Sequence, residues 1–351
     1  MKLPIIASLP MSKNKIKLGI FFGGISPEHT VSLSSAKGII DNVNREKFKV
    51  VEIYINKKGK FYIGTDALKK VVTKNIRKLK KLDINNLPKL IDVAFPVLHG
   101  EGGEDGTIQG LFESLNVPCV GCDVSSSVIC LDKVFFNQIM AVNKIKQSKF
   151  EFLDYEYENN DEINAKIQII KKNFTPPLFI KSARTGSSVG VYKVTDLSLL
   201  EKYINKSRKF DTKVVVEVGV KNAIEVEVSV MGNNDGNIKA SLPGRVLPGA
   251  EFYDFNDKYN NNLAKFEIPV NFSKMKIKEL QSLAIKAYKL TNCKGLARVD
   301  FLLDSRLNIN INEINTLPGF TPVSMYPKLW EVSGLSYSKL LTNLVLLALK
   351  A

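Results

Sequence analysis

The stretch LFIKSARTGSSVGVYKV, residues 178–194, places a loop of small and hydroxyl-bearing residues between two apolar runs. The runs at 178–181 and 191–194 have the composition of strands, which predicts strand, glycine loop and strand in that order. Backbone N–H groups and hydroxyls in such a loop can close over phosphate oxygens. The GxxxxGK[ST] pattern that opens a helix in Walker A loops does not occur in the chain. The stretch therefore predicts a phosphate-covering β-hairpin.

The same loop matches the GxSxG pattern of serine hydrolases at Gly186, Ser188 and Gly190. That pattern requires a strand-to-helix elbow and a histidine base. Here the following segment is predicted as a strand, and both histidines, His29 and His99, precede the serine, against the usual order. We therefore prefer phosphate contact to nucleophilic catalysis.

The chain upstream alternates predicted strands, at 16–22, 50–55 and 93–98, with helical segments. This alternation is typical of a parallel α/β layer, in which ligands collect at the carboxyl ends of the strands. The first strand runs into Gly23-Gly24, and the third runs into His99-Gly-Glu-Gly-Gly-Glu-Asp-Gly106. A histidine that only fills the core would not need so many glycines and polar side chains beside it in the sequence.

Downstream, polar groups mark two neighbouring predicted strands, Arg298-Val-Asp300 and Glu313-Ile-Asn315. Carboxylate and amide oxygens are the ligands that Mg²⁺ with ATP prefers. Such a pair alone is more often an ion-paired surface feature. The turn Thr-Leu-Pro-Gly-Phe at 316–320 favours a site, because its backbone N–H groups can face a developing oxyanion.

Composition excludes several classes of protein. A chain of 351 residues, 44% of them hydrophobic, is long enough for two or three domains. No apolar run approaches the roughly 18 residues of a membrane span, so we expect a cytoplasmic protein without membrane contact. Four cysteines are too few for a disulfide scaffold, and the single CxxC at Cys119 and Cys122 is interpreted as two buried thiols.

The formal net charge of +15 raises the question of nucleic acid. The densest basic stretch, 69–81, contains no aromatic residue. Single-strand binders need such residues for base stacking, and groove readers need a recognition helix. We therefore predict no nucleic-acid partner and a solvated basic surface, which would also help to gather anionic nucleotide.

Taken together, these motifs identify a resemblance to the D-alanine–D-alanine ligases of the ATP-grasp superfamily. It covers nearly all of the chain after residue 15. The segments that carry it, in the family's order, are Gly23–Ser32, His99–Gly110, Gly186–Gly190, Tyr253–Tyr259 and Arg298–Ser324. The resemblance implies an α/β fold with a three-domain ATP-grasp architecture and a Rossmann-like N-terminal domain.

The expected domain limits rest on this resemblance and on a change in the pattern of predicted elements at Asp123. Residues 1–14 are expected to form a poorly ordered leader, with Met11 as an alternative start. Residues 15–122 would form the N-terminal α/β substrate domain and 123–222 the central ATP-grasp domain. Residues 223–351 would form the C-terminal ATP-grasp domain, with a lid loop at 248–262.

By resemblance, the nucleotide-binding residues are Lys133, Lys181, Glu217, Glu225 and Lys258. The resemblance implies metal ligands at Asp300, Glu313 and Asn315. The catalytic residues implied in the same way are Glu28, Ser187, Tyr259, Arg298 and Gly319. The remaining substrate-binding residues are His99, Ser324 and Met325.

The activity that the resemblance implies is ATP-dependent ligation of two D-alanines through a D-alanyl phosphate, for peptidoglycan precursor synthesis. Mg²⁺ or Mn²⁺, two ions in the ATP complex, and a homodimer are implied too. A depsipeptide or D-Ala–D-Ser ligase stays open, although Lys258-Tyr259 favours the dipeptide product. A non-catalytic ATP-binding or nucleic-acid-binding derivative is the alternative of another class. Ser182, where the family usually has proline, and Ile224, where arginine is frequent, depart from the pattern.

Overall fold

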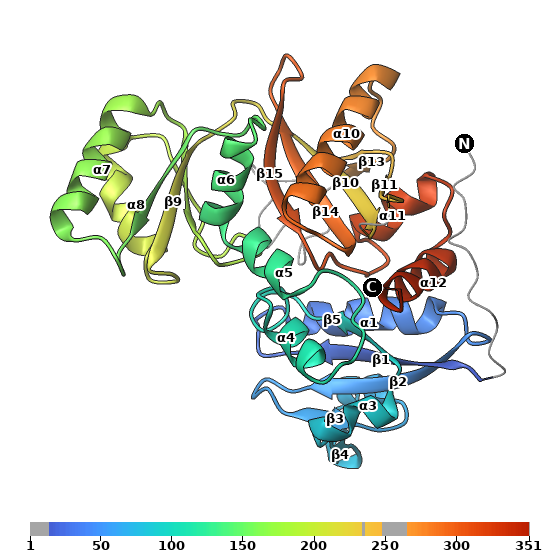
Figure 1. Ribbon diagram of the computed structural model, residues 1–351. Coiled ribbons are helices and arrows are strands. Elements are labelled where there is room, and N and C mark those ends of the chain that lie inside the picture. The colour runs from blue at the N-terminus through green and yellow to red at the C-terminus, as the bar shows by residue number, and fades with distance from the viewer. Residues whose placement is uncertain (1–13, 234–235, 248–264, 351) are drawn as a thin grey trace.

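The structure, a computed structural model, describes residues 14–233, 236–247 and 265–350. Its mixed α/β architecture contains three sheets of five, six and four strands, in agreement with the predicted fold class. In Figure 1 the N-terminal sheet lies at the bottom in blue, the six-stranded sheet above it in yellow to orange, and the four-stranded sheet to the left. The predicted lid loop 248–262, and with it Lys258 and Tyr259, lies outside the described residues, as does the leader up to residue 13.

The five-stranded sheet has the order β4-β3-β2-β1-β5. Its strands are β1 (Ile16–Gly23), β2 (Phe48–Ile55), β3 (Phe61–Ile63), β4 (Lys80–Lys81) and β5 (Val93–Val97). β1 pairs in parallel with both β2 and β5, as the alternation predicts. The prediction of a parallel layer is wrong at the other edge, where β3 and β4 pair antiparallel. Residues 56–60 form a turn between β2 and β3 that is too short for a parallel crossover.

Helices α1 (His29–Asn42), α2 (Ala67–Val72), α3 (Leu87–Leu90) and α4 (Thr107–Ser114) accompany this sheet. Because β1 and β5 are parallel neighbours, their carboxyl ends meet at one edge. The residues that follow those ends, Glu28 and His99, are both buried there. The two sequence motifs of the N-terminal part are thus brought to one place by strand pairing.

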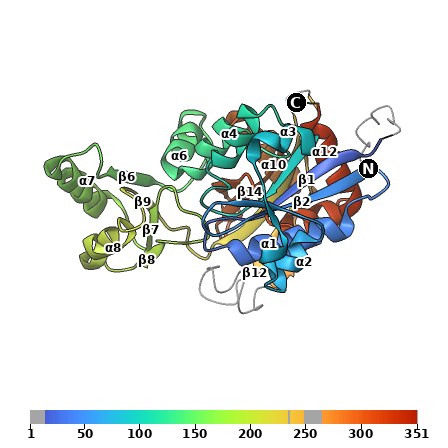
Figure 2. The same cartoon turned by 90° about the horizontal axis from the view of Figure 1, so that it is seen from below.

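The four-stranded sheet, in the order β6-β9-β7-β8, is antiparallel. It consists of β6 (Phe150–Asp154), β7 (Leu178–Ser182), β8 (Tyr192–Val194) and β9 (Lys213–Val218), and α7 (Asn160–Asn173) and α8 (Leu200–Ser207) share its core. The predicted hairpin is therefore confirmed as β7, glycine loop and β8. Figures 1 and 2 agree that this sheet projects to one side of the other two. Helices α5 (Val124–Leu131) and α6 (Lys133–Val142) lead the chain to it.

The six-stranded sheet runs β13-β12-β10-β14-β15, with β11 beside β10. The strands are β10 (Ile224–Gly232), β11 (Lys239–Ala240), β12 (Gly244–Leu247), β13 (Lys265–Glu267), β14 (Gly295–Leu303) and β15 (Ile309–Asn315). Helix α10 (Lys274–Leu290) packs on one face, and its buried side chains share a core with alternate residues of β10 and β14. The opposite face carries polar side chains along its middle, and at one end Met231 and Leu296, which belong to the core of the first sheet.

The chain ends in α11 (Met325–Val332) and α12 (Tyr337–Ala348). Trp330, Leu340 and Leu344 are fully buried and belong to the same core as Leu18 and Phe95 of the first sheet. The last helix therefore faces a core, and that core joins the first sheet to the C-terminal helices. Nowhere in the described ranges does a helix combine the length and apolarity that crossing a membrane requires.

Helix α1 approaches the segment after β15 most tightly at Gly38, where an added Cβ would lie 2.3 Å from the Phe320 carbonyl oxygen. We expect Gly38→Ala to lower the free energy of unfolding by about 1–3 kcal/mol, because backbone must shift to accept the methyl group. Urea unfolding measures this. The control is Gly110→Ala in α4, whose Cβ would make an ordinary 3.7 Å contact. It should be neutral or stabilising by about 0.5–1 kcal/mol. Equal effects of both substitutions would contradict the steric argument.

Candidate active site

β14 and β15 present four of the predicted site residues on one face of the six-stranded sheet. The antiparallel register pairs Arg298 with Asn315 and Asp300 with Glu313. Residues two apart on a strand share a face. The two sequence motifs, which lie more than ten residues apart, therefore meet side by side.

A β-bulge makes this arrangement possible. Asp300 pairs with Glu313 but Phe301 pairs with Ile311, so Asn312 is the extra residue. Without the bulge, Glu313 would share a face with Ile311, which is buried in the core under α10. The extra residue turns Glu313 to the polar face, a common use of bulges beside active sites.

The guanidinium of Arg298 is held by two carboxylates. Its Nε and Nη2 each donate to Asp300, both at 2.7 Å, and Nε lies 3.0 Å from Glu227 Oε2. Burial alone would lower the pKa of Arg298, but the carboxylates of Asp300 and Glu227 outweigh burial and raise the pKa well above its usual value. The arginine is therefore a permanent buried cation.

The predicted metal ligands have the chemistry of a hard-cation site. Asp300 and Glu313 face each other across two strands, and the Asn315 amide oxygen, which accepts from Leu317 N–H at 2.9 Å, lies on the same face. Across the described residues, no group of three or more His, Cys, Asp or Glu side chains could hold a metal unaided. Two carboxylates fit Mg²⁺ that is bound together with phosphate oxygens.

The glycine loop reaches the N-terminal sheet through Ser187. Its Oγ donates to Glu28 Oε1 at 2.5 Å, across 159 residues of sequence. Ser187 and Ser188 both have positive φ, at 51° and 61°, a region that non-glycine residues seldom occupy. Two of the catalytic residues that the resemblance implies, Glu28 and Ser187, are thus in contact, and a third, Tyr259, lies outside the described residues.

His99 is buried beside this pair. Its Nε2 lies 3.1 Å from Ser35 Oγ, and the same hydroxyl accepts from Phe320 N–H at 3.3 Å. Burial lowers the pKa of His99, although the nearby Glu28 carboxylate opposes that shift. We infer a neutral imidazole at pH 7. Ser35 joins the imidazole to the turn that carries Gly319.

Two partly buried lysines lie beside the glycine loop. Lys181 Nζ pairs with Glu217 Oε2 at 2.6 Å, and Asn137 donates to the other carboxylate oxygen at 3.3 Å. Lys133 Nζ donates to the Thr185 carbonyl oxygen at 2.7 Å. Burial lowers the pKa of Lys133, whereas for Lys181 the Glu217 carboxylate outweighs burial and raises the pKa. The ammonium groups of both lysines therefore lie beside the glycine loop, where positive charge can neutralise a phosphate that the loop covers.

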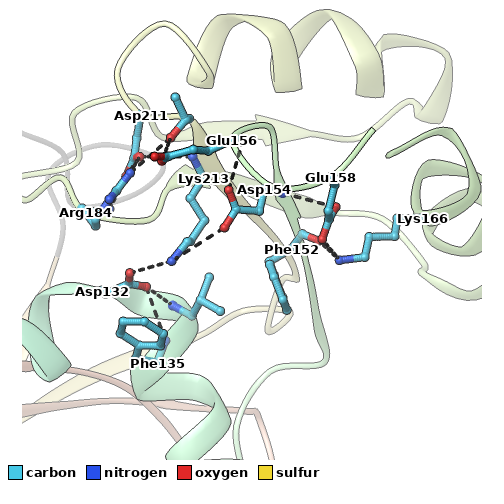
Figure 3. A network of polar contacts seen from close by, with 12 residues as sticks. Asp132, Phe135, Phe152, Asp154, Glu156, Glu158, Lys166, Arg184, Asp211 and Lys213 are labelled. Atoms are coloured by element: carbon cyan, nitrogen blue, oxygen red, sulfur yellow. Dashed lines mark hydrogen bonds and ion pairs between the residues drawn. The ribbon is translucent and has the colours of Figure 1, made fainter. Parts of the chain in front are cut away.

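A polar network outside the cavity fixes the root of that loop (Figure 3). Asp211 accepts from the Arg184 backbone N–H at 2.8 Å and from its guanidinium at 2.5 Å. Lys213 Nζ lies 3.0 Å from Asp132 and 4.0 Å from Asp154. Asp132 also caps α6, directly before Lys133. The loop and the lysine helix are therefore anchored at the start of β9, by Asp211 just before the strand and by Lys213, its first residue.

The side chain of Ser182, which departs from the family pattern, has a hydrogen-bond partner in this structure. Ser182 Oγ donates to the Ser207 carbonyl oxygen at 3.1 Å, and Ser207 Oγ donates to the Gly190 carbonyl oxygen at 2.9 Å. A Cβ at Gly190 would lie 2.3 Å from Ser182 Oγ, and its φ is +72°. The hydroxyl thus packs against the far end of the glycine loop, where only glycine fits.

The site consists of two adjoining cavities of about 620 Å³ and 580 Å³. The predicted residues that line only the first are Glu28, His99, Asn315, Gly319, Ser324 and Met325. Those that line only the second are Lys181, Glu217, Glu225 and Asp300. Of the predicted residues, Lys133, Ser187, Arg298 and Glu313 line both cavities, and so does Glu227, which was not predicted. Every predicted site residue within the described ranges therefore faces one of two connected chambers.

Sequence reasoning assigned no role to two acidic residues of the site. Glu227 follows Glu225 by two residues on β10, so the alternation of charge on that strand could have revealed it. Glu104 belongs to the His99–Gly106 motif, and it lines the first cavity. Burial, reinforced by the charges of Glu28 and Glu313, raises the pKa of Glu104 to about 8.

Comparison with known proteins identifies the family. The model of the D-ala D-ala ligase N-terminus matches residues 17–122, and that of the D-ala D-ala ligase C-terminus matches residues 139–346. The chain belongs to the D-alanine–D-alanine ligase family.

Individual relatives cover almost the whole chain. It is 44% identical to D-alanine–D-alanine ligase B of Clostridium tetani, over 95% of this chain and 94% of the relative. It is 40% identical to the D-alanine–D-alanine ligase of Caldicellulosiruptor bescii, over 96% of each.

Solved structures agree with the predicted ATP-grasp fold. The VanG D-Ala:D-Ser ligase of Enterococcus faecalis matches with a TM-score of 0.84 at 32% identity, covering 95% of this chain and all of that one. The D-alanine–D-alanine ligase of Coxiella burnetii matches with a TM-score of 0.80 at 30% identity, covering 96% of this chain and 94% of that one.

Glu104 predicts a pH effect on stability. In the folded protein it holds its proton up to about pH 8, whereas an ordinary carboxyl loses it near 4.5. The folded state binds more protons in this window, so this group makes the free energy of unfolding fall as pH rises through it. We expect Glu104→Gln to gain stability relative to the unmodified protein between about pH 5 and about pH 8, in urea unfolding. Glu113→Gln, an exposed carboxylate on α4, is the control. Parallel pH profiles for Glu104→Gln and the unmodified protein would contradict the raised pKa.

Proposed function

We propose that the chain joins two D-alanine molecules into D-alanyl-D-alanine at the expense of ATP, through a D-alanyl phosphate. The family makes this dipeptide for peptidoglycan synthesis and depends on ATP. The observation that carries the proposal is the junction of the two cavities at Arg298 and Glu313. Phosphoryl donor and acceptor can meet there without leaving the protein.

The second cavity is proposed to take the nucleotide. Lys133 and Lys181 would neutralise phosphate charge, and Glu217 and Glu225 would accept hydrogen bonds from the adenine side and the ribose. Lys258 would join them from the loop at 248–262. The support is that the four described residues line one cavity under the glycine loop.

Asp300, Glu313 and Asn315 would hold Mg²⁺, with Mn²⁺ as a substitute and two ions in the ATP complex. The bound cation would supply charge neutralisation for phosphoryl transfer. The support is the cross-strand carboxylate pair described above.

Glu28, with Ser187, would bind the ammonium of the first D-alanine. A carboxylate is a poor electrophile, and conversion to an acyl phosphate provides a good leaving group. The second amine then attacks the acyl carbon. Arg298 and the Gly319 N–H would stabilise the tetrahedral oxyanion. The support is that both residues line the first cavity.

The carboxylate of the second D-alanine would bind at the start of α11. Ser324 is the N-cap position, and Met325 is the first residue of this helix. Helix N-termini favour anions. His99, held neutral by burial, would add no charge beside the first substrate. Tyr259 would complete the network with Glu28 when the loop at 248–262 closes as a lid, keeping water from the acyl phosphate.

The resemblance also supports a homodimer in the cytoplasm. Both stay predictions, and the oligomeric state is measured by light scattering of the purified protein.

The function is tested by phosphate release from Mg-ATP with D-alanine, L-alanine, D-serine or D-lactate, alone and in pairs, with product masses recorded. We expect release with D-alanine alone and the mass of D-alanyl-D-alanine. Activity only with D-alanine plus D-serine or D-lactate would reassign the second substrate. ATP binding without phosphate release would favour the non-catalytic alternative.

Arg298→Ala is expected to lower kcat by about 10²–10³-fold, because a preorganised donor to the oxyanion is lost. The circular dichroism spectrum should stay unchanged. Arg306→Ala, an exposed arginine in the turn between β14 and β15, is the matched control and should keep normal turnover. Normal turnover of Arg298→Ala would refute the proposed role.

A further inference from the structure

Glu227 lies at the wall between the two cavities. It stands on β10 directly opposite Asp300 on β14, and its side chain is 8% exposed. Its Oε2 is 3.0 Å from Arg298 Nε. A carboxylate in such a position is expensive to bury unless it has a task or a partner. Its partner is the arginine that the proposed chemistry uses.

Asp300 has two roles that compete. In the structure its two oxygens accept from Nε and Nη2 of Arg298. As a metal ligand, the same carboxylate would share its charge with a divalent cation and bring that cation close to the guanidinium. Like charges at such a distance repel strongly where water is scarce. Cation binding at Asp300 therefore weakens its hold on Arg298.

Glu227 resolves this competition. We infer that Glu227 is the positioning residue for Arg298, whose guanidinium it keeps at the cavity wall while Asp300 binds the divalent cation. Glu227 approaches Nε, the end of the guanidinium nearest the backbone. The two hydrogen bonds to Asp300 use Nε and Nη2, so Nη1 takes no part in them. The inference rests on the proposed function for the metal role of Asp300.

Two consequences separate this role from a merely structural one. Removing the Glu227 charge leaves Asp300 as the principal counter-ion of Arg298, so a cation must compete for it and binds more weakly. Removing it also lets Arg298 move once the cation is bound, so turnover falls while nucleotide binding does not. Loss of a residue behind a metal ligand commonly changes affinity or activity by about 10–100-fold.

The first experiment measures Mn²⁺ binding to the full chain without nucleotide but with inorganic phosphate, whose oxygens complete the site, by the electron paramagnetic resonance signal of free Mn²⁺. We expect Glu227→Gln to weaken binding about tenfold. The matched control is Glu225→Gln, which removes the same charge two residues away on the same strand and face. It should change Mn²⁺ affinity by less than about threefold. Equal weakening in both variants would overturn the inference, because Glu227 would then act only as one more negative charge.

The second experiment is a double-mutant cycle on turnover. Glu227→Gln should lower kcat about 10–100-fold with the KM for ATP nearly unchanged. In an Arg298→Ala background it should lower kcat no further, since residues that act as a unit are not additive. Additive losses, or unchanged kcat in Glu227→Gln alone, would overturn the inference.

Glu227→Asp covers the case in which the glutamine variant does not fold, because it keeps the charge on a shorter side chain that cannot span the 3.0 Å contact. Intermediate losses are expected, and Mn²⁺ affinity and kcat equal to those of the unmodified protein would overturn the inference. The Mn²⁺ measurement needs no turnover. If no dipeptide forms but the two glutamine variants differ as expected, the proposed function fails and the role of Glu227 stands.

Discussion

The hydrophobic core shared by the first sheet and the last two helices is the constraint on which the site depends. Leu18 and Phe95 of the central parallel strands pack in one cluster with Trp330, Leu340 and Leu344. This core brings residues from the beginning and the end of the chain within one hydrogen bond of each other. The bond from Phe320 N–H to Ser35 Oγ spans 285 residues. The turn that carries Gly319 and the part of the first cavity around His99 are therefore set in place by the same packing.

Strand periodicity then decides which side chains reach the site. On β10 and β14, apolar residues alternate with polar ones, so the face under α10 is a core and the other face is a cavity wall. The bulge at Asn312 is the single exception to strict alternation between β14 and β15. It keeps Ile311 in the core and still turns Glu313 to the cavity. One extra residue thus satisfies a packing requirement and a chemical one at once.

The sequence predicted the features that neighbouring residues determine by themselves. The glycine loop between β7 and β8 and the polar ends of β14 and β15 follow from composition and period. The antiparallel edge of β3 and β4 was missed, because pairing depends on a turn whose geometry the strand pattern does not encode. Glu227 was missed for a related reason: its importance comes from Arg298, 71 positions further along the chain but only 3.0 Å away. Roles carried by the resemblance alone, including that of Tyr259, stay predictions.

The residues that line both cavities link the fold to the proposed chemistry. An acyl phosphate must form where the nucleotide and the first amino acid touch, and must react before water reaches it. Arg298, Glu227 and Glu313 face both chambers, so charge that moves from one chamber to the other stays beside the same residues. The loop carrying Ser187 covers the same junction, anchored at its root by Asp211 and at its far end by Ser182. A loop fixed at both ends can hold the Ser187 hydroxyl on Glu28 and the Thr185 carbonyl oxygen on Lys133 at the same time, and its small residues with positive φ allow this tight course.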